Sequence, residues 1–292
     1  MSDTAELFID SKSELGEGIF WHPQLERLFW FDILNQTLHS ATANGIMVDR
    51  FTFDAPVSAA GIIDAQNLAI ASAAGIYRLH LPSDTRELIV PLEDKSTNTR
   101  SNDGRVNRAG GFWIGTMSLT DPGNIRGGSL YQVRDGKVTT LLSNLFIPNS
   151  ACFSPDGRTA YFADTIEGTI RKVSTDPETG LPNGEWQEFV GKGHPGEPDG
   201  AVVDSEGFVW NVRWRGNCVI RFAPNGSVDR IVNVPVLQPT CPAFGGKDLK
   251  TLYITSAREN MTADQLAQYP QSGGVFRIGV DVPGQAEALF RA

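Results

Sequence analysis

The sequence predicts an all-β protein built from six similar units arranged as the blades of a β-propeller. Short apolar strands recur roughly 40 to 48 residues apart, the spacing of propeller blades. Five of the six strands follow a turn rich in Asp, Asn or Gly, residues that supply the backbone angles of tight hairpins. Helical patterns are nearly absent. The six strands are residues 28–31, 68–71, 112–115, 160–163, 208–211 and 251–254.

The other strands of each unit follow from the same pattern. Most of the apolar strands are followed by a Gly and a run that alternates apolar and polar residues, as in a half-buried strand. Residues 138–142 and 186–190 are candidates for outer, fourth strands, so most blades are expected to have four. We expect residues 7–10 to pair near the C-terminal strands and close the ring. One short helix is predicted at 263–268, with Thr262 as its N-cap.

The domain organisation expected from this pattern is one propeller domain over residues 1–292. A β-sandwich, or two separate β-domains, is the alternative for a chain of this length. The regular spacing of the strands favours the single propeller.

Composition restricts the classes of partner. The formal net charge of −9 argues against nucleic acid, and no apolar stretch is long enough to cross a membrane. The N-terminus is polar and acidic, unlike a signal peptide. The three cysteines, Cys152, Cys218 and Cys241, have no metal-type spacing. We therefore expect buried, reduced thiols in a cytoplasmic protein, while the oligomeric state cannot be derived from the sequence.

Four polar residues occupy similar places in different repeats. Glu17, Asn102, Asn149 and Asp199 each lie in a short stretch containing Gly or Pro, about ten residues before an apolar strand. In a radial repeat, equivalent positions converge on the axis. Two carboxylates and two amides meeting there would form an oxygen-rich pocket that suits a hard cation. The sequence therefore predicts a metal site on the propeller axis.

Ordinary structural roles are the alternatives for single residues of this set. Glu17 could be a solvated turn residue, and Asp199 could form an Asx-turn between a Pro and a Gly. Arg100 could be a surface arginine. We expect Asp103, next to Asn102, to cap the turn or orient a neighbour.

Other candidates have weaker patterns. Arg213 and Arg215 flank Trp214 after the fifth apolar strand; they could line the pocket mouth, or form a structural Arg–Trp stack. His194 lies in a Gly- and Pro-containing loop, where either a rim role or a plain loop role is open. No pair of histidines has metal-ligand spacing, and no Gly-x-Ser-x-Gly motif supports a serine hydrolase.

Five scattered motifs together resemble the SMP-30/regucalcin/gluconolactonase family of six-bladed propellers. Each motif alone is weak, but their order and spacing are specific, and they extend over nearly the whole chain. The matching stretches are residues 15–18 with Trp21, 100–104, 115–117, 198–200 and 241–246.

The resemblance implies roles for particular residues. One divalent cation on the axis would be held by Glu17, Asn149 and Asp199, and Arg100 and Asn102 would contact substrate. Some members carry a substrate-binding acid just after the Gly-Thr-Met stretch; this chain has Ser-Leu-Thr there, so Thr120 takes the expected substrate position and the substrate identity stays open.

The activity that the resemblance implies is hydrolysis of a sugar lactone of the gluconolactone type to its aldonic acid. The cofactor would be one divalent cation, with Ca²⁺, Mg²⁺, Mn²⁺, Zn²⁺ and Fe²⁺ all compatible with oxygen and amide ligands. Asp199 would also act as general base. The alternatives are another ester or phosphotriester hydrolase on the same site, or a divalent-metal-binding propeller without catalysis.

Overall fold

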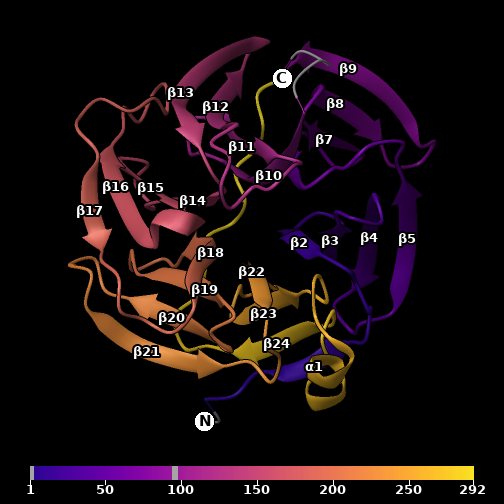
Figure 1. The fold of residues 1–292 in the computed structure, drawn as a ribbon. Helices are drawn as coiled ribbons and strands as arrows, with labels where there is room; N and C mark the ends of the chain where they lie inside the picture. Colours follow the sequence, from indigo (N-terminus) through magenta and orange to yellow (C-terminus); the bar gives the residue numbers. More distant parts are fainter. Residues whose placement is uncertain (1–2, 94–97) are drawn as a thin grey trace.

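Six four-stranded sheets surround a common axis, which confirms the predicted propeller (Figure 1). The computed structural model describes residues 3–93 and 98–292. Neighbouring strands within every sheet pair antiparallel, and in five blades strand order follows chain order. In these five blades the first strand lies nearest the axis and the fourth lies at the rim (Figure 1).

The first three blades have four consecutive strands each, starting with the inner strand. The first blade holds β2 (Gly16–His22), β3 (Arg27–Asp32), β4 (Thr37–Thr42) and β5 (Met47–Thr52). The second holds β6 (Ala59–Ile62), β7 (Asn67–Ser72), β8 (Gly75–His80) and β9 (Thr85–Pro91). The third holds β10 (Thr99–Val106), β11 (Phe112–Ser118), β12 (Gly128–Arg134) and β13 (Lys137–Leu145).

The next two blades repeat this arrangement. The fourth holds β14 (Pro148–Phe153), β15 (Thr159–Asp164), β16 (Thr169–Ser174) and β17 (Gln187–Val190), with a 3₁₀ turn at Thr165–Glu167. The fifth holds β18 (Glu197–Val203), β19 (Val209–Trp214), β20 (Cys218–Phe222) and β21 (Val228–Asn233). The candidate outer strands at 138–142 and 186–190 correspond to β13 and β17.

The sixth blade joins the two ends of the chain. It combines β22 (Pro239–Gly245), β23 (Thr251–Ser256) and β24 (Val275–Gly279) with the N-terminal β1 (Glu6–Ile9) as its outermost strand. Leu7 lies opposite Phe276 in this pairing. The predicted closure by residues 7–10 is therefore confirmed, and it joins the first and last blades into a ring.

The predicted helix is also present. Helix α1 spans Ala263–Gln268, and Thr262 accepts a hydrogen bond from the Gln265 backbone while the Gln265 side chain accepts from the Thr262 backbone. These reciprocal bonds satisfy amide groups that the first turn leaves unpaired. Within residues 3–93 and 98–292, no helix is long and apolar enough to span a membrane.

Apolar side chains pack between adjacent blades and around the second strands. Trp30, Trp113 and Trp210 are completely or almost completely buried and come from β3, β11 and β19. The Trp113 indole donates to the Gln132 side chain at 2.9 Å, and the Trp210 indole donates to Asp204 at 2.9 Å. All three cysteines are buried and unpaired, as predicted. Burial raises the pKa of the Cys152 thiol, so it stays protonated.

The inner strands of five blades contain a shift in register near their first residues. The shifts lie between the following pairs of residues: Glu17 and Phe20, Ser101 and Gly104, Asn149 and Cys152, Pro198 and Ala201, Pro239 and Pro242. Such irregularities bend a strand and redirect its side chains. All four polar residues singled out in the sequence lie at one of these shifts.

The C-terminal segment, residues 283–291, crosses the axis as a strap at the end where the inner strands finish (Figure 1). Gln285 donates to the carbonyls of Phe153 and Val203, which are the last residues of β14 and β18. Glu287 forms an ion pair with Arg105 on β10. The strap therefore connects blades on different sides of the axis.

Candidate active site

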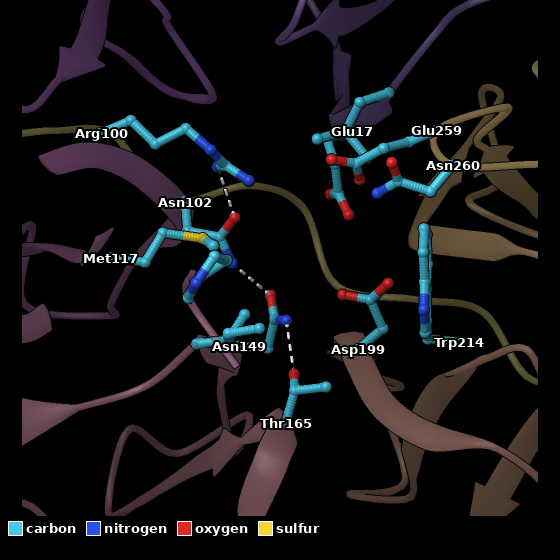
Figure 2. A pocket seen from close by; sticks show the side chains of 13 residues that line it. Glu17, Arg100, Asn102, Met117, Asn149, Thr165, Asp199, Trp214, Glu259 and Asn260 are labelled. Carbon is cyan, nitrogen blue, oxygen red and sulfur yellow. Dashed lines mark hydrogen bonds between the residues drawn. The ribbon is translucent and has the colours of Figure 1, made fainter. Parts of the chain in front are cut away.

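A pocket of about 210 Å³ opens where the inner strands begin. Glu17, Asn102, Asn149 and Asp199 all line it, although they come from four different blades (Figure 2). Arg100, predicted as a substrate contact, also lines it. The convergence expected from the repeat pattern is thus observed. The functions of these residues remain predictions.

Glu17 reaches the pocket from the start of β2, and the backbone around it is tightly constrained. Its carboxylate accepts a hydrogen bond from the Gly18 amide at 3.0 Å. Gly18 has a φ of +53°, and a Cβ there would lie 2.0 Å from the carbonyl oxygen of Ser58, so only glycine fits. Burial, with a smaller contribution from the Asp103 charge, raises the pKa of Glu17 to about 8.

Asp199 faces Glu17 across the pocket from the start of β18 (Figure 2). Its backbone carbonyl accepts from the Ser150 hydroxyl and from the Asn211 amide, which holds the strand at this point. Burial raises the pKa of Asp199 well above its ordinary value, and the charges of Glu17 and Asp103 add to that effect. Burial therefore makes both carboxyl groups hold a proton more tightly than free side chains do.

A chain of hydrogen bonds orients the two amides. Arg100 donates to the Asn102 side-chain oxygen at 2.7 Å, and Asn102 donates to the Asn149 side-chain oxygen at 3.0 Å. Asn149 in turn donates to the Thr165 hydroxyl at 2.8 Å, which donates to the Pro198 carbonyl (Figure 2). These bonds turn the Asn149 oxygen toward Asn102 and leave it one further lone pair.

The donor set fits a divalent cation. Two buried carboxylates face each other, and burial lowers the pKa of Arg100, the neighbouring cation. Groups that are costly to ionise when buried become stable anions when a cation binds between them. No cluster of three His, Cys, Asp or Glu side chains with metal-binding geometry occurs in the described ranges, so an amide such as Asn149 would have to complete the set.

Two further residues considered in the sequence, Thr120 and Asp103, do not line the pocket. Thr120 is exposed, is not among the residues that line the pocket, and accepts a hydrogen bond from Asn98. Its predicted substrate contact has no support in this arrangement. Asp103 is buried behind the pocket, where its carboxylate accepts from the Ala151 amide at 2.9 Å. It therefore holds the inner strand of the next blade, which agrees with the expectation that it orients a neighbour.

The rim candidates separate into structural and pocket residues. Arg213 is buried and donates to the carbonyls of Pro195 and Gly196 and to Asn211, so it fixes the loop before β18. His194 packs against the Phe222 ring, with centroids 5.1 Å apart. Neither residue lines the pocket, and nor does Arg215.

Eight of the 13 residues that line the pocket were not assigned a role at the site from the sequence, and three of them form one wall. Trp214, Glu259 and Asn260 form the wall opposite Arg100 (Figure 2). Each comes at or just after the end of the second strand of its blade, β19 or β23. That position is the signal that could have found them, because the ends of the second strands lie beside the starts of the inner strands.

The fold and site together define a six-bladed β-propeller with an acidic axial pocket. Comparison with known proteins identifies its family. The family model described as "SMP-30/Gluconolactonase/LRE-like region" matches residues 15–258. The chain belongs to this family, which confirms the resemblance found in the sequence.

Named relatives match over almost their full lengths. A 6-deoxy-6-sulfogluconolactonase of Pseudomonas putida is 36% identical over 293 residues, covering 99% of each chain. An L-arabinolactonase of Azospirillum brasilense is 33% identical over 290 residues, covering 98% of this chain and 95% of the relative. The crystal structure of a calcium-binding protein, regucalcin, from Agrobacterium tumefaciens superposes with a TM-score of 0.95 at 37% identity, covering 99% and 98% of the two chains.

Proposed function

We propose that this protein is a lactonase that hydrolyses a sugar lactone with the help of one divalent cation. The single observation that carries the proposal is the pair of buried carboxyl groups, Glu17 and Asp199, that face each other in the axial pocket (Figure 2). The family and the names of the relatives support the reaction class. The neighbouring structure described as calcium-binding supports the cation.

Glu17, Asn149 and Asp199 would hold the cation through two carboxylates and one amide oxygen. When bound, the cation would supply Lewis-acid polarisation of the lactone carbonyl. It would also favour ionisation of Asp199, whose pKa burial raises well above its ordinary value in the protein alone. Cation binding would therefore make Asp199 more available as a base.

The residues of the chain then have distinct parts in the hydrolysis. Asp199 accepts a proton from the attacking water as general base while the water oxygen bonds to the lactone carbon. The bond between that carbon and the ring oxygen breaks, and Asp199 returns the proton to the ring oxygen to give the hydroxy acid, whose carboxyl group then ionises in solution. Arg100 and Asn102, held together by their 2.7 Å hydrogen bond, orient the substrate hydroxyls so that the reacting atoms meet.

The test is a pH-indicator assay, because lactone opening releases a proton. We expect protein stripped of metal to be inactive and to regain activity with Ca²⁺, Mn²⁺, Zn²⁺ or Mg²⁺ on a panel of aldonolactones. Asp199→Ala should abolish turnover and keep the fold, as judged by circular dichroism. Near-normal rates in that variant, or activity only on simple esters or phosphotriesters, would contradict the proposal.

A further inference from the structure

The wall opposite Arg100 is fixed in its backbone and polar in its side chains. The backbone N–H of Glu259 donates a hydrogen bond to the Glu14 carbonyl at 2.9 Å. The backbone carbonyl of Glu259 accepts one from the Gln238 side chain at 3.0 Å. Its carboxylate points into the pocket, beside the amide of Asn260 (Figure 2). These two hydrogen bonds fix the loop backbone at Glu259, so its side chain has a defined position in the pocket wall.

Among the described residues, none forms a hydrogen bond or ion pair with the Glu259 carboxylate or the Asn260 amide. Asn260 also has a φ of +54°, a conformation that glycine adopts at no cost and that asparagine tolerates better than most residues. The conformation accounts for an asparagine or a glycine at this position, and it is the placement of the amide in the pocket wall that makes it available to a ligand.

The charges of the pocket define what could bind there. In the proposed loaded state, the cation offsets Glu17 and Asp199. The charges that remain among the lining residues are the Arg100 guanidinium on one wall and the Glu259 carboxylate on the other (Figure 2). Burial raises the pKa of Glu259, while the charge of Arg100 acts in the opposite direction and favours the carboxylate. An extra negative group on the substrate, placed on the Glu259 side, would meet a like charge in a partly buried site.

The size and surface of the pocket suit one sugar ring. Its volume of about 210 Å³ is below the range of about 300–1,000 Å³ that is usual for drug-sized ligands. The indole of Trp214 lies next to Asn260 and gives this wall an apolar part (Figure 2). A ring with apolar C–H groups and several hydroxyls matches such a wall.

We propose that Glu259 and Asn260 select neutral aldonolactones. Glu259 accepts hydrogen bonds from the substrate hydroxyls that face this wall and repels lactones that carry a phosphate, sulfonate or carboxylate there, while Asn260 hydrogen-bonds the neighbouring hydroxyl. This inference rests on the proposed lactonase function. It adds to that function the charge class of the substrate and the two residues that select it.

The experiment compares kcat/KM for gluconolactone and for its 6-phosphorylated form in the metal-loaded protein. We expect the wild type to prefer the neutral lactone by about tenfold or more. Glu259→Gln should reduce this preference by about tenfold, and should raise KM for the neutral lactone with little change in kcat. The matched control is Glu197→Gln, an exposed carboxylate that does not line the pocket, and it should leave the preference unchanged.

A second variant keeps the test independent of folding. Asn260→Gly retains the backbone conformation and removes only the amide, so KM for the neutral lactone should rise severalfold at unchanged kcat. Equal preference in the wild type and Glu259→Gln, with both enzymes active, would overturn this inference and leave the lactonase proposal standing. Absence of turnover on every lactone in the wild type would instead overturn the lactonase proposal, and this inference with it.

Discussion

Cation binding at the axial pocket should release protons, and the number of protons follows from the two buried carboxyl groups. Glu17 has a pKa raised to about 8, and that of Asp199 lies well above its ordinary value. Both raised values have burial as their main cause. A carboxyl group must lose its proton before its oxygen can bind a cation as an anion.

The magnitude can be worked out at pH 7. With a pKa of about 8, Glu17 is about nine-tenths protonated there. Uptake of one cation should therefore release about one proton from Glu17 at pH 7, in addition to any proton that Asp199 still holds. Through Glu17 alone, the apparent affinity should rise by up to about tenfold for each pH unit between pH 6 and 7, and less steeply above pH 8, where Glu17 is already ionised.

The same shift sets the stability of the protein without metal. Because the folded pKa of Glu17 is above its ordinary value of 4.5, the folded state holds this proton more tightly than the unfolded chain does. This contribution to stability is complete below about pH 4.5 and is lost as the pH rises through about 8. Bound cation should remove that loss, so the gain in melting temperature on adding Ca²⁺ should be larger at pH 8 than at pH 6.

The assay is isothermal titration calorimetry with Ca²⁺ or Mn²⁺ in two buffers of different ionisation enthalpy at one pH, which gives the number of protons released. Asp199→Asn should leave only the release of about one proton by Glu17, and Glu197→Gln should release the same number as the wild type. Release of less than half a proton at pH 7, with an affinity that does not change between pH 6 and 8, would refute the reasoning.

Three further predictions concern stability and can be measured by urea unfolding at pH 7. Gly18→Ala should destabilise the protein by about 3 kcal/mol or more, because the φ of +53° and the Ser58 carbonyl at 2.0 Å leave no room for a methyl group; a loss below about 1 kcal/mol would contradict this. Glu287→Ala should cost about 3 kcal/mol, since it leaves the Arg105 guanidinium buried without its partner; an unchanged unfolding midpoint would argue against it. Thr262→Ala removes the N-cap and should cost about 1 kcal/mol, while Ser227→Ala serves as an exposed control.

The sequence supported prediction of the fold because its repeat is regular. Hairpin turns and apolar second strands recur in each blade, so the six blades and the closure by β1 could be derived from spacing and alternation alone. Glu17, Asn102, Asn149 and Asp199 could be grouped for the same reason, since they occupy equivalent places at the starts of inner strands. The register shifts that turn their side chains to the axis have no clear sequence signal.

The other pocket residues could not be found in this way. Glu259 and Asn260 lie in the loop between β23 and α1, whose length is not repeated in the other blades. Arg213 shows the opposite problem: its position next to Trp214 suggested the pocket, but its three hydrogen bonds to Pro195, Gly196 and Asn211 are made inside the blade. Side-chain direction at the end of a strand depends on tertiary contacts.

The C-terminal strap has a kinetic consequence for the axial pocket. Together with the Arg105–Glu287 ion pair it covers the far end of the axis, and two cavities lined by both of these residues measure only about 20 and 10 Å³. A larger cavity of about 300 Å³ beside Glu287 shares no lining residue with the axial pocket. A small molecule that enters beside Glu17 and Asp199 therefore has to leave by the same mouth. The pocket mouth is then used both for substrate binding and for product release. A lactone cannot enter until the acid has left, so the acid should act as a competitive inhibitor.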